Sequence, residues 1–142
     1  MTYKLFRSST VGLSFIRPQF TGSPVASDYF TLSIGTVNQN GVTSTNATTL
    51  SLPAGSYHLK ASIGGDKSSQ NDTMSYQWEI DGTLLGNEGS WDPGAGQTIT
   101  CEYAELVVNE AAPVSVRLKC LSSSGTLSIL DNVSAVYIRG AL

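Results

Sequence analysis

The sequence predicts an all-β sandwich, and three observations carry the prediction. Apolar and polar residues alternate in short segments, which Gly, Pro, Asn and Asp separate. Charged residues make up 13% of the chain, about half of the roughly 25% usual in soluble domains, and Ser and Thr take the expected solvent-facing positions. No segment repeats its apolar residues with a helical period. At 142 residues the chain has the size of one domain that buries a core without disulfides or metals.

Alternating segments recur from residue 28 onward at the spacing expected of a sandwich or barrel. A jelly roll, with about eight strands in two sheets, fits their number best. We therefore expect an all-β jelly-roll β-sandwich of about eight antiparallel strands with an extended N-terminal arm. The predicted strands cover residues 28–34, 46–52, 57–63, 75–80, 83–86, 98–108, 114–122, 125–130 and 135–139.

Two of these strands show the alternation most clearly. In residues 57–63, Tyr57 and every second residue after it are apolar, whereas His58, Lys60 and Ser62 are polar, so one face is predicted to be buried. Residues 75–80 repeat the pattern with Tyr76, Trp78 and Ile80 on the inward face. Asp81-Gly82 tolerates positive φ and predicts a two-residue hairpin turn to the next strand.

The two cysteines lie on what we expect to be the longest hairpin, formed by residues 98–108 and 114–122. Its inward residues would include Ala104 and Val116, which places Cys120 inside and Cys101 outside. Directly paired residues share a face, so these cysteines would not bond across a regular ladder, although a bulge would shift the parity. We expect two free thiols, which suits a reducing compartment.

The first part of the chain differs from the rest. Residues 1–27 hold short apolar pieces broken by Pro18, Gly22 and Pro24. Proline removes a ladder donor and restricts the residue before it, which favours an extended arm or an edge strand. The alternative is an ordinary first strand of the sandwich. We divide the chain into an N-terminal arm or edge strand at 1–27 and a jelly-roll domain at 28–142.

Several function classes lose support from the composition and the motifs. A net charge of −3 with scattered basic residues disfavours nucleic-acid binding. No apolar run is long enough to cross a membrane, and residues 1–8 lack the pattern of a signal peptide. His58 is expected to be solvated on the polar face of its strand, and no nucleophile elbow, phosphate loop or zinc-spaced cluster occurs. We therefore expect no enzyme, no catalytic residue, no metal and no cofactor.

A few polar residues still deserve a functional alternative. The carboxylate pairs Glu79 with Asp81 and Glu102 with Glu105 have the residue types that a glycosidase needs, but a solvated strand end explains the first pair without chemistry. The loop at 66–72 offers oxygen ligands for calcium without the glycine and final glutamate of a calcium loop, so we expect a polar loop tip. Trp91, in the loop predicted at 87–97, would form a sugar platform or a contact with another chain, or else pack on its own sandwich end.

The segment at 50–61, LSLPAGSYHLKA, resembles the "LPAGxYxxxA" segment of virion-associated domains of tailed bacteriophages. Downstream, the segment at 78–86, WEIDGTLLG, is similar to the hairpin of that family that ends in a leucine pair. The segments at 116–120 and 135–138 resemble its late and closing strands. The resemblance covers residues 28–142, and its sharpest motif is the proline-glycine turn that enters an alternating strand.

The resemblance implies a trimeric jelly roll of the tumour-necrosis-factor and complement-head type. Such trimers bury aromatic residues around a three-fold axis, and the candidates here are Tyr57, Tyr76, Tyr103 and Tyr137.

The first function implied is a trimeric capsid decoration (cement) protein, a homotrimer bound to the major capsid protein on the virion surface and assembled in the host cytoplasm. Apolar anchors and charges in the N-terminal arm would then contact the capsid: Tyr3, Leu5, Phe6, Arg7, Phe15, Ile16, Arg17 and Phe20. The alternative is a receptor- or glycan-binding head of a tail fibre, with Trp91 and Asp92 in the binding site.

Overall fold

The computed structural model describes residues 12–16, 25–32, 42–67, 72–91, 99–100, 103–125, 127–129 and 134–141. All of the regular structure in these ranges is β, as the sequence predicts, and no helix occurs in them. The strands are β1 (Gly12–Ile16), β2 (Thr43–Asn46), β3 (Thr49–Leu52), β4 (Gly55–Ser62), β5 (Gly64–Lys67), β6 (Thr73–Ile80), β7 (Thr83–Trp91), β8 (Ile99–Thr100), β9 (Ala104–Glu110), β10 (Val114–Ser124), β11 (Leu127–Ile129) and β12 (Ala135–Ala141).

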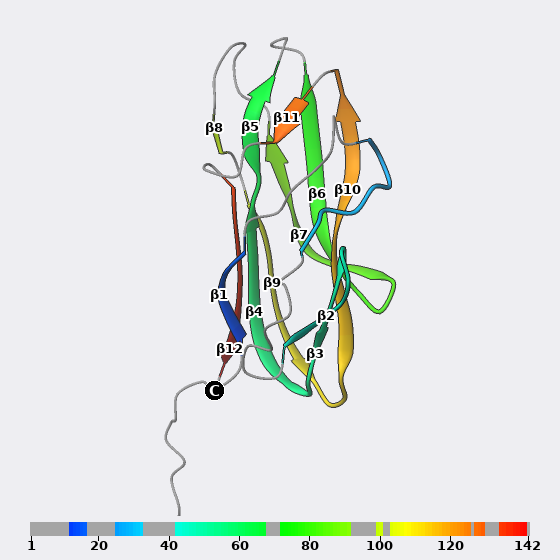
Figure 1. Cartoon of the computed structure of the whole chain (residues 1–142), viewed down its shortest axis with the longest axis vertical. Coiled ribbons are helices and arrows are strands. Elements are labelled where there is room, and N and C mark those ends of the chain that lie inside the picture. The colour runs from blue at the N-terminus through cyan, green and yellow to red at the C-terminus, as the bar shows by residue number, and fades with distance from the viewer. Residues whose placement is uncertain are drawn as a thin grey trace, which may run out of the picture.

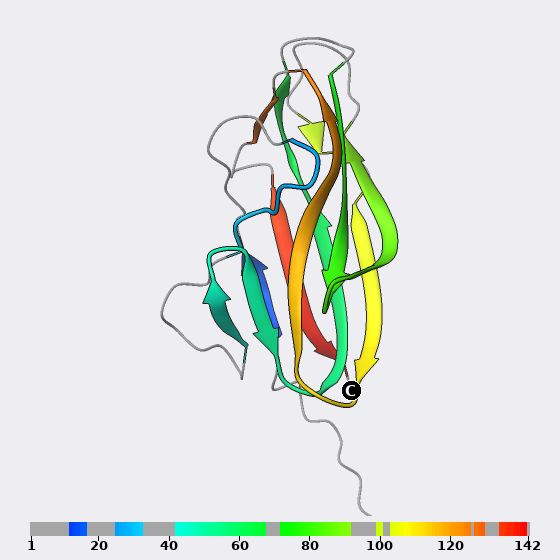
Figure 2. The same ribbon diagram turned by 90° about the vertical axis from the view of Figure 1, so that its right-hand side faces the viewer.

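Two antiparallel sheets face one another and form the sandwich (Figure 1 and Figure 2). One sheet has the order β1-β12-β4-β9, and the other has the order β2-β3-β10-β6-β7. A third, small sheet with the order β11-β5-β8 lies at the upper end in Figure 1. The fold is a jelly-roll β-sandwich, as predicted.

One antiparallel ribbon runs through all three sheets. It pairs β3 with β10, β4 with β9 and β5 with β8. The first corner, where the ribbon passes from one large sheet to the other, lies between the pairs Leu52–Val114 and Gly55–Glu110. Across this corner the segment from β3 to β4 advances three residues, whereas the segment from β9 to β10 spans four. The second corner, near Ile63, repeats this slip of one position. The ribbon therefore folds over twice without losing its pairing.

The core lies between the two large sheets and takes alternate side chains from each. Tyr57, Leu59, Ala61 and Ile63 are all buried, as predicted, and so are Tyr76, Trp78 and Ile80. At roughly 1.5–3 kcal/mol for each large apolar side chain, this burial is the main stabilising term. The buried hydrophobic residues are Phe30, Leu32, Val42, Leu50, Leu52, Tyr57, Leu59, Ala61, Ile63, Met74, Tyr76, Trp78, Ile80, Ala104, Leu106, Val114, Val116, Leu118, Cys120, Leu127, Val136 and Ile138.

The β6–β7 turn is the two-residue hairpin that the sequence predicts. Asp81 has φ of 47° and Gly82 has φ of 87°, the left-handed region that this turn type requires. Asp81 also ties the turn to β10, because its Oδ1 accepts a hydrogen bond from Ser115 N at 2.8 Å.

The predicted hairpin between residues 98–108 and 114–122 is wrong. The first of these segments divides into β8 and β9, and β9 pairs with β4 whereas β10 pairs with β3 and β6. The turn between β9 and β10 thus crosses from one sheet to the other. Alternation correctly assigned the inward side chains, but it carries no information about which strand lies alongside.

The segment at 25–32 lies beside β10 without forming the strand predicted at 28–34. Its backbone forms hydrogen bonds with β10. Phe30 N donates to Leu118 O at 2.9 Å, and Cys120 N donates to Asp28 O at 2.8 Å. Phe30 and Leu32 are fully buried. Residues 33–34 lie outside the described ranges.

The strand β7 is longer than predicted, because residues 87–91 belong to it and not to a loop. Its middle bends toward β9, where Gly86 has φ of 80° and a Cβ would collide with the carbonyl oxygen of Glu105. Asn87 then bridges to β9, donating from Nδ2 to Tyr103 O at 2.8 Å and accepting at Oδ1 from Glu105 N at 3.2 Å. One side chain thereby joins the two sheets at this side of the sandwich.

At the second corner of the ribbon, a buried hydroxyl satisfies the backbone of Gly64. Ser134 Oγ accepts from Gly64 N at 3.0 Å and donates to Gly64 O at 3.1 Å. We predict that Ser134→Ala lowers the free energy of unfolding by about 1–3 kcal/mol, because it leaves buried backbone groups without their partner. Urea titration measures this change, with the exposed Ser122→Ala as control. Equal losses in the two variants would contradict the role assigned to Ser134.

Candidate functional site

The outer side of the four-stranded sheet is the strongest candidate for a contact surface. We call it the β4–β9 face and define it by Ser56, His58, Lys60, Tyr103, Glu105, Val107 and Asn109. The inward neighbours of these residues, such as Leu59 and Leu106, pack in the core, so the alternation directs the face residues outward.

The polar groups of the β4–β9 face are paired with one another. His58 Nε2 lies 2.7 Å from Glu105 Oε2, and Ser56 Oγ donates to Asn109 Oδ1 at 2.9 Å. Lys60 Nζ lies 3.8 Å from the centre of the Tyr103 ring, a cation–π distance. Burying this face under another surface would therefore leave few polar groups without a partner.

Two apolar or aromatic side chains of the β4–β9 face are exposed to solvent. Val107 is 70% exposed, the highest value among the large hydrophobic residues that the structure describes, and Tyr103 is 42% exposed. The face also has a charge pattern, since β4 contributes the basic His58 and Lys60 and β9 contributes the acidic Glu105. Two basic groups on β4 thus lie beside one acidic group on β9.

Two of the four tyrosines predicted for a trimer interface lie elsewhere. Tyr57 is 1% exposed and Tyr76 is 0% exposed, so both fill the protomer's own core, and the prediction of an interface role for them is wrong. Tyr57 Oη donates to Pro53 O at 2.6 Å, and Tyr76 Oη accepts from Ile63 N at 3.0 Å. Each hydroxyl finds a backbone partner, which allows the tyrosine side chain to be buried in the core.

The other two tyrosines belong to strands of the four-stranded sheet or lie next to them. Tyr103 lies in the β4–β9 face just before β9. The backbone of Tyr137 in β12 pairs with Lys60 of β4, and its side chain lies outside the described part of the structure. A contact through Tyr103 or Tyr137 stays a prediction.

The predicted capsid-contact residues lie mostly outside the described ranges. Phe15 and Ile16 belong to β1, which pairs with β12 at the edge of the four-stranded sheet. The backbone there is an edge strand, one of the alternatives for this part of the chain. Tyr3, Leu5, Phe6, Arg7, Arg17 and Phe20 lie outside the described residues, and capsid contact by the arm stays a prediction.

The residues predicted for glycan binding are not described at the level of side chains. Trp91 is the last residue of β7, and its backbone pairs with Met74 of β6. Asp92 lies outside the described residues. The glycan-binding alternative therefore stays a prediction from the sequence.

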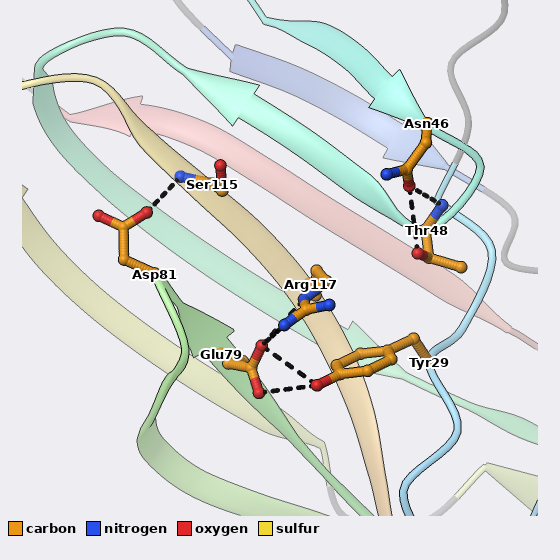
Figure 3. Close-up of polar contacts among 7 residues, drawn as sticks. All are labelled: Tyr29, Asn46, Thr48, Glu79, Asp81, Ser115 and Arg117. Carbon is orange, nitrogen blue, oxygen red and sulfur yellow. Dashed lines mark hydrogen bonds and ion pairs between the residues drawn. The ribbon is translucent and has the colours of Figure 1, made fainter.

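A polar cluster on the outer side of the five-stranded sheet corrects the expectation for Glu79. Glu79 is 4% exposed rather than solvated. Arg117 Nε donates to its Oε1 at 2.9 Å and Tyr29 Oη donates to its Oε2 at 3.1 Å, as Figure 3 shows. The Arg117 guanidinium also stacks on the Tyr29 ring, 3.9 Å from its centre. Sequence periodicity placed Glu79 outward correctly but could not show that Tyr29, 50 residues away, covers it.

No metal-binding cluster comes together in the described ranges, and the described members of the two carboxylate pairs contact other groups. No group of three or more His, Cys, Asp or Glu side chains in them could hold a metal ion. Asp81 contacts the backbone of Ser115, whereas the Glu79 carboxylate is occupied by Arg117 and Tyr29. Glu105 is engaged with His58, and Glu102 lies outside the described residues. The described ranges contain no helix, and therefore no helix that could cross a membrane.

Cys120 is buried with a free thiol, as predicted, and Cys101 lies outside the described residues. The parity argument for the two cysteines fails because their segments do not form a ladder with one another. Burial, assisted by the charge of Asp28, raises the pKa of the Cys120 thiol from 9.0 to about 11. Burial also raises the pKa of Tyr57.

Comparison with known proteins identifies the fold. No protein-family model matches the chain, and no curated protein matches it. The solved structure of Eiger TNF from S. frugiperda aligns with a TM-score of 0.60 at 11% identity over 91% of this chain and 91% of that chain. CBM35 from Cellvibrio japonicus Abf62 aligns with a TM-score of 0.42 at 14% identity over 90% of this chain and 98% of that chain. The first likeness establishes a jelly-roll fold.

We predict that Arg117→Met destabilises the fold by about 2–4 kcal/mol, because it leaves the buried Glu79 carboxylate without its counter-charge. Tyr29→Phe should cost about 1 kcal/mol, since it removes one hydrogen bond and keeps the ring. Lys119→Met is the matched control on the same strand and the same side of the sheet. Urea unfolding compares the three, and a loss in the control as large as that of Arg117→Met would contradict the ion-pair explanation.

A second prediction concerns alkaline pH. Between pH 9.0 and about 11 the unfolded chain loses the Cys120 proton while the folded chain keeps it. The unfolded state then binds fewer protons, so stability falls as pH rises, by on the order of 2 kcal/mol from this group. Unfolding free energies across this range should decline less steeply for Cys120→Ala than for the natural chain. Parallel curves would show that the thiol does not contribute.

Proposed function

We propose that this chain is a non-enzymatic virion structural protein, a trimeric capsid decoration protein that stabilises a phage head. The observation that carries the proposal is the β4–β9 face, where polar groups are paired with one another while Val107 and Tyr103 remain exposed. A surface with these properties suits burial against another copy of the same chain.

We infer that three copies meet through this face. In a head-to-tail contact, β4 of one copy would lie against β9 of the next, with Lys60 near Glu105 of the neighbouring copy. Such a contact is heterologous, and three copies close it when the rotation between neighbours is one third of a turn. The likeness to a TNF structure concerns the fold, and trimeric assembly of this chain is our inference from the face.

Capsid attachment rests on the sequence resemblance to virion-associated domains of tailed phages. A decoration protein acts by burying surface over several capsid subunits at once, which requires contact groups beyond the trimer interface. The N-terminal residues named above, from Tyr3 to Phe20, supply apolar anchors and charges for this contact. The proposal needs no catalytic group, metal or cofactor.

The assembly part of the proposal is tested by light scattering on the purified chain. We expect three times the 15.0 kDa mass of one chain. Val107→Asp should weaken assembly by at least about tenfold, because it buries an unpaired charge in the interface. Val25→Asp is the control, since Val25 is also exposed, at 56%, but lies on the segment beside β10. A natural chain that is monomeric at all concentrations would overturn the trimer.

The capsid part is tested by co-sedimentation with undecorated phage heads. The natural chain should bind, and a Phe6→Ser/Arg7→Glu variant should keep its oligomeric mass and bind at least about tenfold more weakly, since it loses an anchor and a charge. Equal binding by the two chains would remove the arm from the contact. No binding by either chain would overturn the decoration function while leaving the assembly result intact.

A further inference from the structure

The outer edge of β9 offers unpaired backbone groups. β9 is the last strand of its sheet and pairs only with β4. In an antiparallel strand the N–H and C=O of one residue point to the same side, and successive residues alternate. Asn87 reaches Tyr103 O and Glu105 N from the side away from β4. These contacts show which residues of β9 face the open edge.

The same alternation turns the backbone of Val107 and Asn109 toward the open edge. The register between β4 and β9 runs without a slip from Ala104 to Glu110, so the parity is kept. Within the described ranges, no backbone hydrogen bond reaches Val107 or Asn109 from that side. Two donors and two acceptors are thus available at the spacing that an added strand requires.

This edge lacks the features that usually prevent another strand from adding to it. Edge strands are commonly protected by lysine, by proline or by a bulge. Between Leu106 and Glu110 the sequence has no lysine or proline, and the pairing with β4 has no bulge. Only the part at Tyr103 and Glu105 is closed, by Asn87 and the bend of β7. The open part of the β9 edge therefore begins at Val107.

Acidic side chains lie along this edge. Glu105 and Glu110 lie on β9 itself, and Glu88 is exposed on β7. The basic side chains of the neighbouring β4 are already engaged, His58 with Glu105 and Lys60 with the Tyr103 ring. An acidic surface of this kind attracts a basic partner.

We propose that the edge of β9 from Val107 to Asn109 is a docking site for an extended, basic segment of a partner protein, which adds to the sheet as a further strand. Asn87 sets the register, because it already occupies the backbone groups of Tyr103 and Glu105. Lysine or arginine side chains of the segment would lie beside Glu105 and Glu110. The inference concerns the edge of the protomer and does not depend on the decoration function.

The test is a titration of the isotope-labelled full-length chain with the peptide Thr-Lys-Val-Arg-Val-Lys-Thr, followed by NMR. The amide signals of Val107 and Asn109 should shift, whereas that of Val108, which points to β4, should move least. The acidic peptide Thr-Glu-Val-Glu-Val-Glu-Thr is the matched control and should cause no shift. Glu110→Lys should weaken binding of the basic peptide by about tenfold, since it reverses a charge beside the edge.

Equal shifts with both peptides, or shifts that centre on Lys60 and Tyr103, would overturn the docking site. A folded Glu110→Lys variant that binds the basic peptide as well as the natural chain would overturn the role of charge. The N-terminal segment of another copy is also basic, so a Lys4→Glu/Arg7→Glu variant is compared without peptide. Altered Val107 and Asn109 signals in that variant would mean that a second copy occupies the edge, which would overturn the foreign partner.

Discussion

The double ribbon formed by β3, β4 and β5 with β10, β9 and β8 is the element on which the rest of the structure depends. The two chain segments of the ribbon, one with β3, β4 and β5 and the other with β8, β9 and β10, must turn together at each corner. Both segments must also keep their apolar side chains in one core. The slip of one position at each corner meets these two demands. Three surface features described above lie on this ribbon, because β4 and β9 provide the β4–β9 face, β9 provides the open edge, and β10 carries Arg117.

The outer sides of the two large sheets differ in how far their side chains are exposed to solvent. On the five-stranded sheet, Tyr29 covers Glu79 and Arg117 neutralises it, so a charge is sealed within the protomer. On the four-stranded sheet, polar pairs share the surface with the exposed Val107. The first surface needs nothing further, whereas the second gains from being covered. This difference is why we assign assembly to the β4–β9 face.

The sequence predicted the local features of the fold and missed the distant ones. Alternation identified the inward residues of β4 and β6, and the Asp81-Gly82 turn was correct, because each depends on neighbours along the chain. The pairing of β9 was wrong, because proximity in sequence suggested β10 whereas the ladder forms with β4. The prediction of a trimer interface at Tyr57 and Tyr76 came from the resemblance, and an aromatic residue at an inward position serves a core or an interface equally well. Asn87 carries no sequence signal, since its role requires the bend at Gly86.

The crossing of the β9–β10 turn between sheets also affects how the chain can fold. Of the strand pairs in the two large sheets, only β2 with β3 and β6 with β7 are joined by short turns, and the others bring together distant segments, such as β4 with β12. Loop closure must precede such contacts, so a topology of this kind folds in milliseconds to seconds and not in microseconds. The β6–β7 hairpin, with its local turn and the Trp78 side chain, can form early and give β10 a template. Among the described pairs, the β1–β12 ladder joins the most distant segments, so its closure costs the most chain entropy.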